Sequence, residues 1–145
     1  MKDKRIHAED VAYWKSSTTS PDTWTDRAKK VIAQAGGIVL AEGFGQDNEG
    51  LAAYMLAFSF GEERFKIVWP VLASKAGNGK AARIQAATCL YHDVKARAIS
   101  AKVLGFRAAY LTYWLLSDGR TASEAASPEL MEAMPKLLMA AINNS

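Results

Sequence analysis

The chain has 145 residues, of which half are hydrophobic and 23% are charged. These proportions are typical of one folded globular domain, and they exclude a chain that is disordered over most of its length. The formal net charge is +3, and no sequence period of 20–50 residues indicates a repeat array.

The residues that report on compartment favour a soluble cytoplasmic protein. Cys89 is the only cysteine, which excludes an intramolecular disulfide and fits a reducing environment. No apolar run follows the charged residues Met1–Arg5, so no secretory signal is predicted. The apolar stretch Leu51–Phe58 is far shorter than the roughly 20 residues that cross a membrane.

A helix is predicted to open the folded part of the chain. Residues 1–19 mix charges with aromatic and hydroxyl side chains, which indicates a loose N-terminal arm with a helical turn at His7–Trp14. Ser20 and Pro21 are typical of a helix start, and Gly36 with Gly37 supplies the stop. The domain organisation is therefore an arm over 1–19 and a single α+β domain over 20–145.

Three short strands are predicted next. Residues 43–50 contain three glycines and indicate a hairpin loop, and Gly61 with Glu62 forms a tight turn. Such short connections require an antiparallel meander, and Pro70 places the third strand at an edge. The expected strands are Ile38–Glu42, Leu51–Phe60 and Arg64–Leu72.

Helices dominate the rest of the chain. A long Ala-rich helix is predicted over Lys80–Leu104, and Gly105 ends it. Aromatic spacing over Phe106–Leu116 favours another helix, with a strand as the alternative. Further helices are expected at the capping box from Thr121 and at Ser127-Pro128, and Pro135 kinks or splits the latter. The fold class is α+β: a three-stranded antiparallel sheet packed by a long Ala-rich helix and further helices, with a β-β-β-α core.

The positive charge is concentrated in the middle of the chain. Residues 61–107 carry nine basic and three acidic side chains. Such a segment attracts a polyanion, and bases of a single strand can stack on interleaved aromatic residues such as Trp69 and Tyr91. The alternative is a solvated surface with its acids nearby. The candidate nucleic-acid-binding residues are Arg64, Lys66, Lys80, Arg83, Lys95, Arg97, Lys102 and Arg107.

Other chemistry has weaker signals, and we predict no catalytic residue, metal site or cofactor. Cys89 is expected to be a buried mid-helix thiol, and His92 a buried, hydrogen-bonded side chain. Adjacent helical residues diverge, so His92 and Asp93 do not form a dyad. The loop Gly77–Lys80 lacks the P-loop spacing and is expected to cap the helix or to contact one phosphate.

The order of three strands, a long basic helix and Leu104-Gly105-Phe106 over residues 38–107 resembles the core of phage single-strand-annealing recombinases of the Red-beta/Erf type. The resemblance implies single-stranded DNA in a basic groove between hairpin and helix. It also implies protomers that assemble side by side into rings or filaments, hence a homo-oligomer. Groove residues would include Lys66, Lys80, Arg83, Lys95, Arg97 and Lys102.

The sequence therefore predicts a non-catalytic nucleic-acid-binding accessory protein of recombination or annealing type, with single-stranded DNA as ligand and no membrane partner. The alternative is a small protein-interaction or assembly module of phage or plasmid type with no nucleic-acid role. An enzyme would need a pocket that gathers His92, Asp93, Glu42 or tyrosines from different elements.

Overall fold

The computed structural model describes residues 5–46, 48, 51–110 and 114–122, without the side chains of residues 107 and 108. It confirms the α+β class and the β-β-β-α core. The elements are a 3-10 helix η1 (Ala8–Asp10), α1 (Pro21–Gln34), β1 (Ile38–Gln46), β2 (Ala52–Phe60), β3 (Glu63–Val71), α2 (Gly79–Leu104) and α3 (Phe106–Tyr110).

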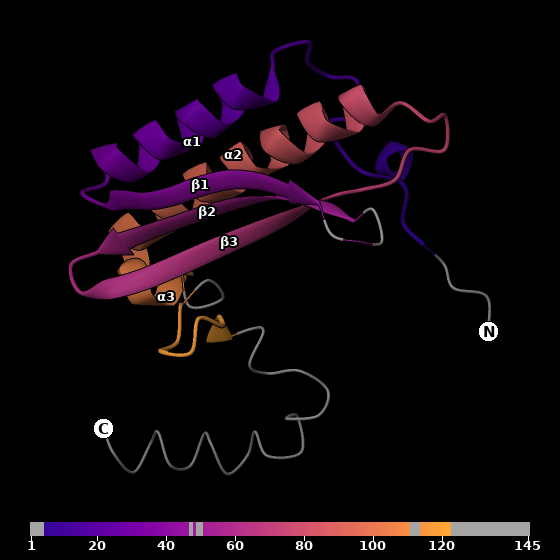
Figure 1. Ribbon diagram of the computed structural model, residues 1–145. Coiled ribbons are helices and arrows are strands. Elements are labelled where there is room, and N and C mark those ends of the chain that lie inside the picture. Colours follow the sequence, from indigo (N-terminus) through magenta and orange to yellow (C-terminus); the bar gives the residue numbers. More distant parts are fainter. Residues whose placement is uncertain (1–4, 47, 49–50, 111–113, 123–145) are drawn as a thin grey trace.

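The molecule has two layers, a sheet and a pair of helices (Figure 1). The strands pair antiparallel in the order β1-β2-β3, so β3 is an edge strand as Pro70 predicts. The helices α1 and α2 pack against each other on one face of the sheet. Alternate strand residues supply the core between the layers. The central core side chains on the strands are Leu56, Phe58, Phe65 and Ile67.

Local chemistry explains where the two long helices begin. The Ser20 hydroxyl accepts a hydrogen bond from the Thr23 N–H at 3.3 Å, and Pro21 follows in the first helical position. Asn78 caps α2 in the same way, because its side-chain oxygen accepts from the Ala81 N–H at 3.0 Å. Gly105, with a φ of 87°, ends α2 in a conformation that favours glycine.

Two predicted element boundaries are wrong. β1 continues to Gln46, four residues beyond the predicted end, because pairing with β2 carries it through Gly43 and Gly45. The helix expected over Phe106–Leu116 does not extend to its predicted end, since Trp114 bridges Phe65 of β3 in an extended conformation. Most of the capping box from Thr121, the helix at Ser127-Pro128 and Pro135 lie outside the described residues.

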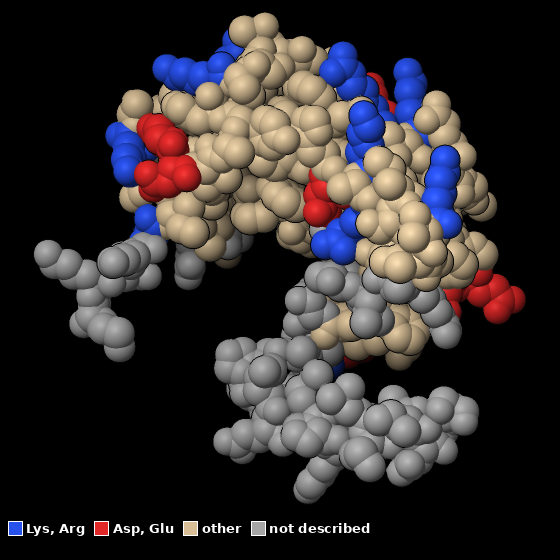
Figure 2. All heavy atoms as spheres, turned by 180° about the vertical axis from the view of Figure 1, so that it is seen from behind, with Lys and Arg blue, Asp and Glu red and all other residues tan. Residues whose placement is uncertain are grey.

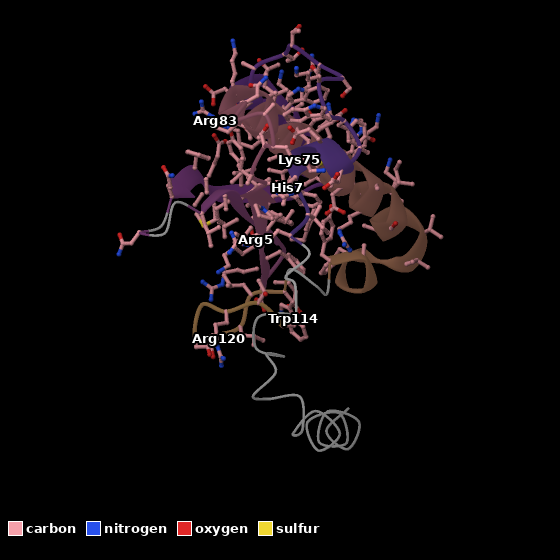
Figure 3. All side chains as sticks on the ribbon, turned by 90° about the vertical axis from the view of Figure 1, so that its right-hand side faces the viewer. Arg5, His7, Lys75, Arg83, Trp114 and Arg120 are labelled. Carbon is pink, nitrogen blue, oxygen red and sulfur yellow. The ribbon has the colours of Figure 1, made fainter. Side chains whose placement is uncertain are left out.

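The described part of the N-terminal arm is tied to the domain more firmly than the sequence predicts. The Ala8 N–H donates to the Ala73 carbonyl at 2.9 Å. The Glu9 carboxylate accepts hydrogen bonds from the Ser74 hydroxyl and from the Lys75 and Ala76 N–H groups, at 2.9–3.0 Å. These bonds join η1 to the loop between β3 and α2, and Figure 3 labels His7 and Lys75 at this junction.

The Glu9 contacts lead to a pH prediction. Desolvation raises the pKa of Glu9, but the backbone N–H groups of Lys75 and Ala76 outweigh it and lower that pKa from 4.5 to about 2. Ionised Glu9 should therefore stabilise the fold fully above about pH 4.5, and this stabilisation should be lost as the pH falls towards 2. Denaturant unfolding of wild type and Glu9→Gln across this range should show a stability difference that shrinks with falling pH.

The exposed carboxylate of Glu62, in the turn after β2, provides the matched control. Glu62→Gln removes a carboxylate from a turn outside the arm and should leave the free energy of unfolding close to that of wild type. A difference between wild type and Glu9→Gln that stays constant down to pH 2 would contradict the role of Glu9 in holding the arm.

Candidate nucleic-acid interface

Two of the predicted binding residues lie on the face of the sheet that carries no helix. Arg64 and Lys66 alternate along β3 with Phe65 and Ile67, which are buried against the helices. Their side chains therefore point to the opposite face, where the Lys66 Nζ donates to the Gly119 carbonyl at 3.2 Å.

The other described candidates belong to α2. Lys80, Arg83, Lys95 and Lys102 are exposed. Arg97 is partly buried and has a structural role: its Nε is 3.1 Å from Asp93 Oδ2, and its Nη1 donates to the Ala109 carbonyl at 2.8 Å. The side chain of Arg107 lies outside what the structure describes.

The sheet lies between these two groups, so the structure does not bring them together in one trough. Figure 3 shows the separation: Arg83 lies at the top of the view and Arg120, next to the Lys66 contact, lies near the bottom. The expected groove needs the outward side chains of β3 to extend the basic surface of α2 along the sheet edge. Burial of Phe65 and Ile67 against the helices leaves Arg64 and Lys66 on the opposite side of the sheet from α2.

The positive charge instead belongs to the helical layer. Together α1 and α2 carry eight Lys or Arg residues and three Asp residues, a net charge of +5, whereas the three strands have a net charge of zero. In Figure 2, which shows the molecule from behind Figure 1, the Lys and Arg side chains lie around a broad uncharged centre. This distribution favours contacts at several separate points over one continuous basic stripe.

An aromatic cluster joins the helical layer to the arm. The rings of Tyr13 and His92 stack at 4.7 Å with an interplanar angle of 8°. Trp24 lies 5.3 Å from Tyr91 and 5.9 Å from His92. His92 is half-buried in this ring stack, rather than fully buried as the sequence predicts.

Two cations lie over the rings of this cluster. The Arg27 guanidinium is 4.7 Å from the Trp24 ring centre, and the Lys95 Nζ is 5.9 Å from that of Tyr91. Sequence reasoning missed Tyr13, Trp24 and Arg27, because Trp24 fits the apolar stripe of α1 and Tyr13 lies in the arm. The only sequence signal that could have found Tyr13 and Trp24 is the local density of aromatic residues, and Arg27 has none.

The backbone of the arm positions Tyr13 for this stack. Tyr13 and Lys15 have positive φ values of 69° and 52°, a region that non-glycine residues seldom adopt. The buried Gln85 amide of α2 donates to the carbonyls of Ala8, Val11 and Ala12 at 2.7–3.2 Å. These bonds place the turn at Tyr13 against α2 and so hold its ring over His92.

The N-terminal end of α2 contributes two further cations, in a cavity that also includes Asp22. A cavity of about 370 Å³ is lined by Lys80 and Arg83 of α2, by Phe44 and Tyr54 of the sheet, and by the start of α1. The loop Gly77–Lys80 caps the helix through Asn78, which agrees with the simpler of its two predicted roles. Whether this loop contacts a phosphate stays a prediction.

Groups that could support catalysis are engaged elsewhere. Burial raises the pKa of the Cys89 thiol, which lowers the fraction of reactive thiolate. Glu42 contacts Lys29 at 2.6 Å, and Asp93 pairs with Arg97. Within the described residues, no group of three or more His, Cys, Asp or Glu side chains is arranged to hold a metal ion.

None of the helices in the described part of the chain combines the length and apolar character needed to cross a membrane. Comparison of the chain with protein-family models, curated proteins and solved structures gave no match.

Proposed function

We propose that the protein is a non-catalytic nucleic-acid-binding protein that holds single-stranded DNA against the outer side of its two-helix layer. The observation that carries the proposal is the net charge of +5 on α1 and α2 beside an aromatic cluster, while the strands are neutral overall. Phosphates would meet the exposed lysines and arginines, and bases would stack near Tyr13.

Cations beside an accessible aromatic ring favour single-stranded DNA over duplex DNA as the ligand. Tyr13 is 40% exposed in its stack with His92, so its ring is accessible to a further planar group. Arg27 and Lys95 flank the same cluster and would contact the phosphates on either side of a stacked base. Unpaired bases can reach such a surface, whereas paired bases are held inside a duplex.

Binding of a fluorescent oligothymidine, followed by anisotropy, tests the proposal. Affinity should fall steeply between about 50 mM and 200 mM salt, because each phosphate contact releases counterions. Lys80→Gln with Lys95→Gln should weaken binding and reduce the slope of log K against log salt by about 0.7 for each lost contact. An absence of binding by wild type at low salt would overturn the proposal.

A double variant on the other face of the sheet is the matched control. Arg64→Gln with Lys66→Gln removes the same charge but acts on the side opposite the helices. It should leave affinity close to that of wild type. If this double variant weakens binding as much as Lys80→Gln with Lys95→Gln does, the DNA does not lie on the helical layer.

The second candidate is an interaction module without a nucleic-acid role, and the helix-free face of the sheet favours it. Met55 and Val68 are exposed there. An open groove of about 1130 Å³, lined by these residues with Ala53, Pro70 and the arm, runs across one end of this face. Co-purification with a protein, together with failure to bind oligothymidine, would favour this candidate.

A further inference from the structure

The two edges of the sheet differ in how far other segments of the chain cover them. The β3 edge is partly covered, because Trp114 bridges Phe65 and the Leu115 N–H donates to the Arg64 carbonyl at 2.7 Å. Pro70 also removes a donor from this strand. From Ile38 to Gly45, the outer edge of β1 is paired by none of the segments that the structure describes.

β1 also lacks the residues that usually protect an edge. None of its nine residues is Lys, Arg or Pro, and its only charged side chain is Glu42. Ile38, Leu40 and Phe44 are exposed. The one irregularity in its pairing with β2 lies between Val39 and Ala41, which leaves the strand from Ala41 to Gln46 in regular register. A long apolar edge of this kind is a template for another strand.

Two glycines in β1 have no explanation within the chain itself. A Cβ at Gly43 or Gly45 would meet no atom within 4 Å, and neither residue has the positive φ that favours glycine. Glycine weakens an isolated strand and often marks a place where a second backbone approaches closely. Both glycines therefore fit a β1 strand that is covered in the functional state.

We propose that the β1 edges of two copies of this chain pair antiparallel about a two-fold axis. The product is a dimer with one continuous six-stranded sheet, three strands from each copy. A two-fold arrangement satisfies both edges at once, since each β1 supplies the partner for the other. The dimer is tested by the molar mass without nucleic acid and the DNA proposal by the affinity for oligothymidine, so failure of one is distinguishable from failure of the other.

Charge on α1 favours a second copy over an unrelated strand. α1 packs over β1, and its acidic residues Asp22 and Asp26 precede its basic residues Lys29 and Lys30. A two-fold axis beside β1 runs the two α1 helices antiparallel, so the acidic half of each faces the basic half of the other.

The single charge on the strand is already compensated. Lys29 Nζ lies 2.6 Å from Glu42 and 3.1 Å from Asp26. Two Glu42 side chains near the axis would therefore each keep a cation of their own, which lowers the repulsion between them.

The difference between the edges also sets the size of the assembly. A ring or filament needs two different complementary surfaces on each copy. The β3 edge is partly occupied by Trp114 and Leu115, so it is not available as a second surface. The β1 edge therefore pairs with the β1 edge of another copy, and the assembly contains two copies.

The experiment is a measurement of molar mass in solution without nucleic acid, by light scattering after size exclusion and by sedimentation equilibrium over a wide range of concentration. Wild type should have the mass of a dimer. Ile38→Lys with Leu40→Lys places two cations on each edge, at side chains that are 65% and 51% exposed, and should give a folded monomer.

The matched control is Ile99→Lys with Leu104→Lys on α2, where the same residue types are 59% and 67% exposed. This variant should remain a dimer. Circular dichroism of both double variants should match wild type, which separates loss of assembly from loss of fold. Wild type that stays monomeric at the highest concentration, or a dimer that the β1 variant does not dissociate, would overturn the proposal.

Discussion

Replacement of Phe58 by alanine should lower the free energy of unfolding by about 3–5 kcal/mol. Phe58 is fully buried in the central strand. Its ring lies 5.8 Å from Phe60, 5.7 Å from Phe65 and 5.3 Å from Tyr110. The loss combines the transfer energy of a large side chain with the cavity left between three rings that belong to different elements.

Urea unfolding followed by tryptophan fluorescence measures this loss. Phe58→Leu, which should cost about 1–2 kcal/mol, keeps the effect measurable if the alanine variant is too unstable to purify. Phe44→Ala is the control: Phe44 is 45% exposed at the sheet edge and should cost about 1 kcal/mol or less. Equal losses for Phe58→Ala and Phe44→Ala would show that the core is not centred on β2.

Replacement of Gln85 by leucine should lower the free energy of unfolding by about 2–3 kcal/mol, although the volume of the side chain is nearly kept. The Gln85 amide is buried and donates to the carbonyls of Ala8, Val11 and Ala12. Leucine leaves these carbonyls without that donor, so the arm should detach from α2 at lower denaturant concentration than the rest of the domain unfolds.

Limited trypsin digestion reports detachment of the arm directly, because Lys15 lies within the released segment. Gln34→Leu is the matched control, since Gln34 is exposed near the end of α1. Gln85→Leu should be cut faster than wild type at Lys15, and Gln34→Leu should not. Equal cutting rates for all three proteins would show that other contacts are sufficient to hold the arm.

Much of the fold follows from local signals in the sequence. Ser20 with Pro21 places the start of α1, and Gly105 places the end of α2. The alternation of Phe65 and Ile67 with charged residues identifies β3 and its buried face. The second half of β1 gives no such signal, because Gly43 and Gly45 resemble a loop and become strand only through pairing with β2.

The arm could not be predicted because its partners are distant in sequence. Glu9 binds the loop after β3, and Gln85 binds carbonyls that lie 73–77 positions before it. Contacts between residues so far apart produce no periodic pattern in the sequence. A polar arm next to hydroxyl residues therefore indicates a loose segment.

The sequence predicts which charged residues belong to the candidate site, but not how their side chains are arranged in space. Residues Ile84 to Thr88 of α2 are all buried, because β3, α1 and the arm surround this part of the helix. A helix buried on all sides has no single apolar stripe, so the sequence does not fix which way its charged residues face. The outward position of Arg64 follows from the alternation along β3, which places it on the face opposite Phe65.

The long span of the Gln85 bonds has a consequence for the order of events during synthesis. Residues 8–12 leave the ribosome well before residue 85 has been added, so their carbonyls have no partner while α1 and the sheet are being made. Attachment of the arm is therefore a late step that closes a loop of more than seventy residues. A nascent chain stalled within β3 would expose Tyr13 and Trp14 to chaperones and proteases.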